Sequence, residues 1–228
     1  MTGPSTNNKD SFFARKEQAE FVMRVYRETP AVIRDLFRQE NELLLKALGE
    51  SRRVLEIGCG FGRAVDSVPS GSSYFGIDIG LPYIVEASHL HPNRLWICGD
   101  ATRLPLPDRC FDTAFCIQNT LGNMIGLEAA VLTQAQRILR ASGRLILSLY
   151  SEDSFEIRRM WYDRLVDIGI FRRFWLDSEN PRIARSDTGW SSRCYDKTEI
   201  ADLLASGFAK IHMQKLDSFL YFVVAQTA

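Results

Sequence analysis

The sequence lacks several features that would have pointed to particular protein classes. It has five cysteines, an odd number at irregular spacing and without a Cys-x-x-Cys pair, which argues against a disulfide framework and a zinc knuckle. It has only three histidines, and no Cys–His or Ser–His–Asp set emerges from the spacing. Lys plus Arg and Asp plus Glu are 28 each, so the composition gives no support for a basic nucleic-acid-binding surface.

Long apolar runs are also missing. No segment approaches the roughly 20 residues of a membrane-spanning helix, and the first ten residues lack the apolar core of a signal peptide. We therefore expect a cytoplasmic protein that neither crosses nor binds a membrane. Nothing in the sequence indicates its oligomeric state.

What the chain does have is the material for one large α/β domain. It has 228 residues, of which 46% are hydrophobic, enough to bury a core without disulfides or a structural metal. The pattern of apolar, polar and turn-forming residues predicts five segments. Residues 1–10 are a disordered N-terminus, 11–50 an N-terminal helical cap divided at Pro30, and 51–150 a ligand-binding core. Residues 151–193 are an inserted aromatic-rich lid, and 194–228 a helix and the closing strands of the core.

Within the core, short apolar strands alternate with helices, which is typical of a parallel sheet covered on both faces. The pattern predicts a doubly wound, mostly parallel, Rossmann-like sheet with seven strands, at residues 54–57, 73–78, 95–98, 113–117, 143–150, 208–215 and 219–225. The expected helices are at residues 63–68, 81–90 and 127–140, in the lid from Ser151, and after Asp196. In such a sheet ligands bind at the carboxyl ends of the strands.

The clearest motif is a glycine cluster directly after the first strand of the core. Gly58, Gly60 and Gly62 let the backbone turn sharply and approach a ligand closely. The helix expected at residues 63–68 would add free N–H groups and partial positive charge. Asp78, about 20 residues further on at the end of the second strand, is placed to accept both hydroxyls of a ribose.

Two cofactor classes fit such a loop, and its spacing separates them. A dinucleotide site prefers Gly-x-Gly-x-x-Gly, whereas this loop reads Gly-x-Gly-x-Gly followed by Arg63. Glu56, two residues before the first glycine, would repel a pyrophosphate and attract a cationic amino acid. A nicotinamide-dependent oxidoreductase and a non-catalytic nucleoside-binding module remain alternatives.

Several ordered segments resemble the class I S-adenosylmethionine-dependent methyltransferases, in particular domains of the type 11 and type 25 kind. Val54–Arg63 is similar to the first motif of that family, and Gly76–Ile79 is similar to its second-strand motif. Gly99–Asp108 resembles the segment that holds adenine, and Phe111–Phe115 resembles the fourth strand. Before the fifth strand the chain has Ala141–Gly143 where the family usually has Pro-Gly-Gly, which is a variation of a turn.

This resemblance implies S-adenosylmethionine as cofactor, S-adenosylhomocysteine as product, and no metal. Glu56 would face the methionine part, Asp78 the ribose, Asp100 the adenine amino group and Gln118 the sulfonium. Each also has a structural alternative: a surface ion pair, a helix cap, a turn aspartate and a core amide, respectively. The implied cofactor-binding set is Glu56, Gly58, Cys59, Gly60, Gly62, Asp78, Ile79, Asp100, Ala101 and Gln118.

The acceptor of the methyl group is expected above the fourth and fifth strands, under the lid. The candidate residues there are Tyr26, Asn119, Asn123, Tyr150, Trp161 and Trp190. The asparagines could equally be turn residues and the aromatic residues could be packing. No catalytic residue is assigned, so we expect a small organic acceptor, methylated on nitrogen or oxygen, that is nucleophilic itself or is activated by a tyrosine or asparagine. A peptide, protein or nucleic-acid acceptor is the alternative.

The ribose assignment makes a first testable prediction. Asp78→Ala should weaken binding of the adenosyl cofactor by about 1–3 kcal/mol, because paired hydrogen bonds to a charged group are lost. Calorimetric titration of the stably folded variant measures this change. An affinity equal to that of the unsubstituted protein would refute the ribose role.

Overall fold

The computed structural model describes residues 12–14 and 17–227, so the N-terminal segment expected to be disordered lies outside the described residues. Its main element is a seven-stranded sheet in the order β3-β2-β1-β4-β5-β10-β9. The strands are β1 (Arg53–Ile57), β2 (Ser73–Asp78), β3 (Leu95–Cys98), β4 (Phe111–Cys116), β5 (Leu139–Tyr150), β9 (Phe208–Leu216) and β10 (Leu220–Thr227). The first five pair in parallel, and β10 is antiparallel to both its neighbours. The predicted Rossmann-like fold is confirmed.

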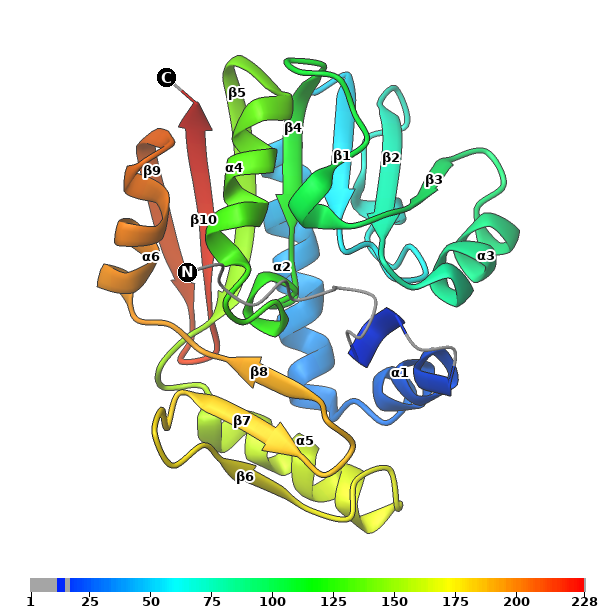
Figure 1. Cartoon of the computed structure of the whole chain (residues 1–228), viewed down its shortest axis with the longest axis vertical. Helices are drawn as coiled ribbons and strands as arrows, with labels where there is room; N and C mark the ends of the chain where they lie inside the picture. Colours follow the sequence, from blue (N-terminus) through cyan, green and yellow to red (C-terminus); the bar gives the residue numbers. More distant parts are fainter. Residues whose placement is uncertain (1–11, 15–16, 228) are drawn as a thin grey trace, which may run out of the picture.

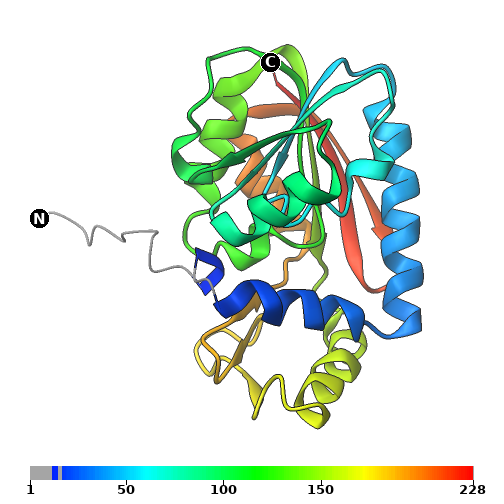
Figure 2. The same cartoon turned by 90° about the vertical axis from the view of Figure 1, so that its right-hand side faces the viewer.

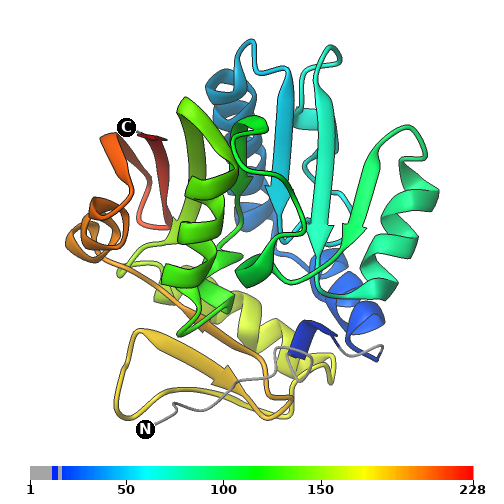
Figure 3. The same ribbon diagram turned by 45° about the horizontal axis from the view of Figure 1, so that its top comes forward.

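Helices cover both faces of the sheet, and each face has its own core (Figures 1 and 3). Successive strand residues alternate between the two: Val54 packs in the core with α2 (Ala31–Leu48), whereas Leu55 packs in the core with α4 (Glu128–Ile138) and α6 (Lys197–Ala205). Because both faces are covered, the central strands β1, β4 and β10 are buried along nearly their whole length, whereas the edge strands β3 and β9 are partly exposed. α3 (Leu81–Leu90) lies beside β2 and β3.

The two N-terminal helices have different places in the fold. Pro30 separates α1 (Glu17–Arg27) from α2, as the sequence predicts, and Gly49 ends α2 with a positive φ of 50°. α2 packs along the sheet, but α1 lies crosswise between the lower edge of the sheet and the lid (Figure 2). The short turn η2 (Phe12–Ala14) precedes α1. Of the expected helical cap, it is therefore α1 that covers the carboxyl ends of the strands.

The lid consists of one helix and a small antiparallel sheet. α5 (Phe155–Asp167) is followed by β6 (Phe174–Leu176), β7 (Ile183–Ser186) and β8 (Ser191–Arg193). The lid helix was expected from Ser151, but Ser151 forms a bridge with Tyr195 and its N–H donates to the Phe219 carbonyl. The small sheet was not predicted, because strands of three or four residues are too short to show a period of two.

A second difference concerns the segment after the glycine loop. The helix expected at residues 63–68 is only a 3-10 turn, η3 (Val65–Ser67). Pro69 disfavours helical geometry at the residue before it, and Val68 is extended at φ −92° and ψ 128°. The loop therefore gains no helix dipole. Two further 3-10 turns, η4 (Ala101–Arg103) and η5 (Leu121–Asn123), lie after β3 and β4.

A buried amide connects the lid to the core. Asn119, which follows β4, is 1% exposed. Its Nδ2 donates to Ser192 Oγ at 2.9 Å and to the Arg193 carbonyl at 3.0 Å, and its Oδ1 accepts from the Tyr150 N–H at 2.9 Å. One side chain thus joins the loop after β4 to β5 and to β8.

Asn119→Ala should lower the free energy of unfolding by about 2–4 kcal/mol, since three hydrogen bonds are lost and buried partners are left unpaired. Urea denaturation measures the effect, with the exposed Asn93→Ala as a control that should change stability by less than about 0.5 kcal/mol. Equal stability of the two variants would show that the amide does not anchor the lid.

Candidate active site

A cavity of about 540 Å³ opens at the carboxyl ends of β1, β2 and β4. Its volume falls within the range of small-molecule binding sites, about 300–1,000 Å³. Most of the predicted cofactor set lines it, and Gly62 and Asp100 are the members not among the described lining residues. From the predicted set these residues line the cavity: Glu56, Gly58, Cys59, Gly60, Asp78, Ile79, Ala101 and Gln118, with Tyr26 and Asn123 from the acceptor set.

The glycine loop brings the backbone close to this cavity. Gly58 has a φ of 72°, and a Cβ there would lie 2.2 Å from Thr120 Cγ2, so a larger residue would collide with the loop after β4. Gly60 has a φ of 51° and no heavy atom within 4 Å of its ideal Cβ position, which leaves space on the cavity side. Both positions require backbone geometry that glycine adopts without strain.

Asp78 is fixed at the end of β2 by the backbone on both sides. Its Oδ2 accepts from the Gly60 N–H and its Oδ1 accepts from the Gly80 N–H, each at 2.9 Å. Burial raises the pKa of this carboxyl group, and the N–H donors oppose that rise. Asp78 therefore shapes the glycine loop as well as the cavity, so replacing it removes loop contacts in addition to any ligand contact.

Glu56 is a buried carboxyl group in β1, 5% exposed, that faces the cavity. It accepts a hydrogen bond from the Tyr74 hydroxyl of β2. Burial raises the pKa of Glu56 to about 8, although Tyr74 and Arg63 both oppose the rise. A cationic group that enters the cavity would favour the ionised form and bring this pKa down.

The sequence did not assign two charged residues that adjoin this site. Arg63 lines the cavity, donates from Nη1 to Gln118 Oε1 at 2.6 Å, and lies 3.8 Å from the centre of the Tyr26 ring. Glu40 of α2 is fully buried and accepts from the Gln118 N–H at 3.0 Å and from the Ser148 hydroxyl. Burial raises the pKa of Glu40 to about 7.

Each of these two residues had a sequence signal. Arg63 directly follows the third glycine of the loop. Glu40 occupies the apolar face of α2, four residues after Leu36 and four before Leu44, both of which are buried. A carboxyl group on an apolar helical stripe must find partners inside the protein.

Of the remaining predicted cofactor residues, Gln118 and Ala101 line the cavity, whereas Asp100 is not among the described lining residues. Gln118 has a φ of 55° at the end of β4, and its side chain lines the cavity beside Arg63. Ala101 lines the cavity, but the Asp100 carboxylate accepts from the N–H and the hydroxyl of Thr102, each at 2.8 Å, as the cap of η4. This is the turn role that the sequence left open, and the adenine contact stays a prediction.

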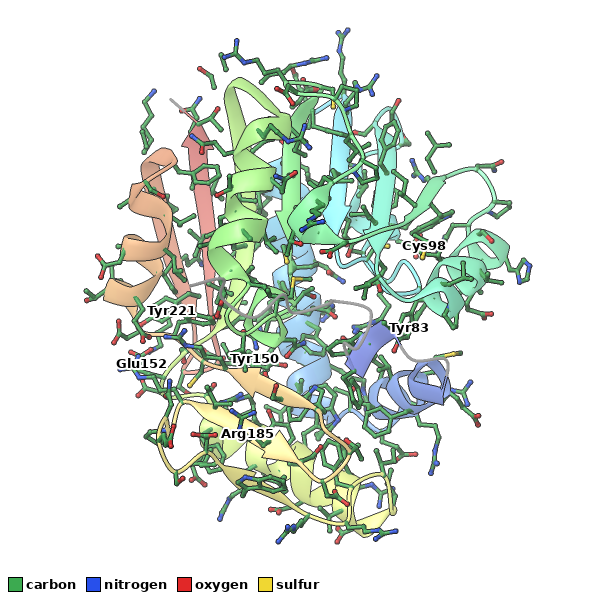
Figure 4. All side chains as sticks on the ribbon, in the orientation of Figure 1. Tyr83, Cys98, Tyr150, Glu152, Arg185 and Tyr221 are labelled. Carbon is green, nitrogen blue, oxygen red and sulfur yellow. The ribbon has the colours of Figure 1, made fainter. Side chains whose placement is uncertain are left out.

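Tyr83 is a further lining residue that the sequence did not assign. It lies on α3, close to η2 (Figure 4). Its hydroxyl is buried without a hydrogen-bond partner among the described residues. A donor or acceptor on a ligand would satisfy this group.

A second, smaller pocket of about 70 Å³ lies between the lid and α1, and Tyr26, Gln118 and Asn123 line both cavities. Tyr150, Trp161 and Trp190 of the predicted acceptor set line it, and Tyr150 lies where the sheet meets the lid (Figure 4). The Asn123 Oδ1 is buried without a hydrogen-bond partner among the described residues. The sixth predicted residue, Asn119, has its amide committed to the lid contacts, which is its structural alternative.

The part of the chain that the structure describes contains no group of three or more His, Cys, Asp or Glu side chains placed to hold a metal ion. Within the same part, no helix combines the length and the apolar character that crossing a membrane requires. None of the three histidines, His89, His91 and His212, is among the described residues that line either cavity.

Comparison with known proteins agrees with this geometry. Residues 55–147 match the model of a methyltransferase domain family. The chain is 33% identical over 110 residues to the demethylmenaquinone methyltransferase of Beutenbergia cavernae, an alignment that covers 47% of this chain and 45% of that protein. The chain spans about half the length of the curated relatives it matches.

Solved structures share the fold. A protein of Pyrococcus horikoshii has a TM-score of 0.72 at 21% identity, covering 94% of this chain and 100% of that one. The 1,6-didemethyltoxoflavin-N1-methyltransferase of Burkholderia thailandensis, solved with 1,6-didemethyltoxoflavin and S-adenosylhomocysteine, has a TM-score of 0.64 at 17% identity, covering 100% and 93%. Residues 55–147 thus match a methyltransferase domain, and the curated relatives and this sheet topology support the resemblance to the class I S-adenosylmethionine-dependent methyltransferases.

Proposed function

We propose that the protein transfers a methyl group from S-adenosylmethionine to a small organic acceptor, on nitrogen or oxygen. The observation that carries this proposal is the joining of two unlike cavities at one edge of the sheet. The larger has a buried carboxyl group, Glu56, a half-buried one, Asp78, and a glycine loop, whereas the smaller is lined mainly by aromatic rings.

The residues present fit S-adenosylmethionine. Glu56 would take the ammonium of the methionine part and Arg63 its carboxylate, because the two side chains put opposite charges at one end of the cavity. Asp78 would take the ribose hydroxyls. The space beside Gly60 would let the ligand approach the protein backbone closely. When bound, S-adenosylmethionine supplies an activated methyl group on a sulfonium.

The chain itself would contribute mainly position. Holding an acceptor in line with the methyl group replaces a bimolecular encounter and supplies much of the rate. α1 contributes lining residues to both cavities and the lid contributes them to the smaller one, and Tyr26 lines both. A small acceptor is favoured because the second pocket is only about 70 Å³, and because a formal net charge of zero gives no support for a basic nucleic-acid-binding surface.

Two of the compared proteins support a small-molecule acceptor. One is named for demethylmenaquinone and the other was solved with 1,6-didemethyltoxoflavin. Both names describe organic molecules rather than proteins or nucleic acids.

Parallel calorimetric titrations with S-adenosylmethionine, S-adenosylhomocysteine and NAD test the cofactor. The two adenosyl compounds should bind in the micromolar range and NAD should not bind, because the loop reads Gly-x-Gly-x-Gly rather than the Gly-x-Gly-x-x-Gly that a dinucleotide prefers. Binding of NAD alone would overturn the proposal, and silence from all three ligands would favour a non-catalytic role for the fold.

The affinity for S-adenosylmethionine should depend on pH. In the ligand-free protein Glu56 has a pKa of about 8, so below that pH it is mostly protonated and must lose a proton before it can pair with an ammonium. Affinity should therefore rise with pH up to about pH 8, by at most about tenfold per unit.

Glu56→Gln should flatten this dependence, because the amide cannot ionise. Glu40→Gln is the matched control, since it removes the other buried carboxyl group and leaves Glu56 in place; its dependence should still level off near pH 8. A Glu56→Gln protein with the pH dependence of the unsubstituted protein would exclude Glu56 as the partner of the ammonium.

A further inference from the structure

The proposed function leaves one buried charge unused. Arg158 of α5 is 1% exposed, yet it takes part in none of the ion pairs formed by the described residues. Its Nη1 donates to the Tyr162 hydroxyl at 3.3 Å, and its Nε is buried without a hydrogen-bond partner among the described residues.

A lone guanidinium in this position is unfavourable for folding. Charged groups are normally buried only with a partner of opposite charge, because the interior replaces water poorly as a solvent. Residues that break this rule mark places where function has overridden stability. An anion that binds near Arg158 would supply the missing partner.

The charge of Arg158 lies directly behind the wall of the second pocket. The centre of its guanidinium is 4.9 Å from the centre of the Tyr150 ring and 5.9 Å from that of the Tyr162 ring, and both tyrosines line the pocket. None of the described residues that line this pocket is itself an acid or a base of the Asp, Glu, His, Lys or Arg type. The positive charge of Arg158 therefore makes the electrostatic potential positive at the wall of the pocket that the lid forms.

The other nearby charges are balanced. Arg63 lies over Tyr26, at the junction of the two cavities, but Glu40 and Glu56 both interact with its charge. Glu40 also lies near Tyr150, where its charge opposes that of Arg158 when it is ionised. Because burial raises the pKa of Glu40 to about 7, a proton on Glu40 removes that opposition.

The walls of the pocket favour a flat ligand. Trp190 packs against Phe171 with ring centres 5.7 Å apart and planes 28° apart, and against Tyr162 edge-on at 5.3 Å. The pocket of about 70 Å³ has about half the volume of a ~150 Å³ cavity that holds benzene. It would therefore receive one edge of a ring whose body lies at the junction with the larger cavity.

We propose that this pocket binds the acceptor as a planar aromatic oxyanion of the phenolate or enolate type, opposite the positive charge of Arg158. The Tyr162 oxygen accepts from Arg158, so the Tyr162 O–H remains able to donate to the anion. The proposal rests on the methyltransferase function above and refines its acceptor. An aromatic pocket alone would also suit a cationic amine, but a buried cation behind its wall disfavours one.

An ionised acceptor also explains how the site manages without a general base. A base is needed only for a nucleophile that keeps its proton until it reacts. None of the described residues lining the second pocket is a histidine or a carboxylate. Binding the acceptor after it has lost its proton to water removes that need.

The test compares an anion with its neutral ether. Protein saturated with S-adenosylhomocysteine is titrated with 4-nitrophenolate, at a pH where this phenol is ionised, and separately with 4-nitroanisole. No methyl group is available, so both titrations report binding alone. The phenolate should bind at least about tenfold more tightly, as expected of a hydrogen-bonded charge in a buried site.

Two substitutions on α5 localise the effect. Arg158→Met, similar in length but uncharged, should remove the preference for the phenolate and change the affinity for 4-nitroanisole by less than twofold. Arg159→Met is the matched control, because Arg159 is the next residue, is 54% exposed and pairs with Glu156 of its own helix. The Arg159→Met protein should prefer the phenolate as strongly as the unsubstituted protein does.

Equal affinities of the unsubstituted protein for phenolate and ether would overturn the proposal, and so would binding of neither. A preference that survives in Arg158→Met would also overturn it. If Arg158→Met does not fold, Arg158→Lys, which keeps the charge, replaces it and should retain a preference for the phenolate. Failure to bind S-adenosylhomocysteine would instead refute the proposed methyltransferase function, so the two failures are distinguishable.

Discussion

Burial of carboxyl groups at one edge of the sheet is the constraint on which the rest of the site depends. Glu40, Glu56 and Asp78 come from α2, β1 and β2, and burial raises the pKa of each. Such groups persist inside a protein only when donors surround them. The donors are the Tyr74 and Ser148 hydroxyls and the backbone N–H groups of Gly60, Gly80 and Gln118. These contacts fix the glycine loop and the loop after β4, which together form the floor of the cavity.

The two cavities differ in how their charges are balanced. In the larger one, Arg63 stands near two carboxyl groups, and a ligand with both an ammonium and a carboxylate would complete the arrangement. In the smaller one, rings form most of the wall, and the nearby guanidinium of Arg158 pairs with no acid among the described residues. The Asn119 amide connects the lid to the core, because it forms hydrogen bonds with β5 and with β8 from the loop after β4. The same lid therefore lines the smaller pocket and is hydrogen-bonded to the core.

Where sequence and structure differ, the reason lies in contacts between distant segments. Residues 63–68 have the composition of a short helix, but Pro69 and the tight turn of the glycine loop leave only three residues in a 3-10 turn. Asn119 follows β4 as an acceptor-positioning residue would, yet its partners lie 31 and more than 70 residues away along the chain. No local pattern carries that information.

The sequence by itself determined the sheet, its strand positions, the glycine loop and the acids beside it. These follow from local periodicity and from the geometry of parallel strands, whose carboxyl ends must meet at one edge. Only the tertiary structure decided which buried charges have partners. Glu40 and Arg158 both occupy buried faces of helices, but burial brings Glu40 to Gln118 and Ser148 and leaves Arg158 between two tyrosine rings. The free energy of a buried charge depends on its neighbours in space, and those neighbours exist only once the chain has folded.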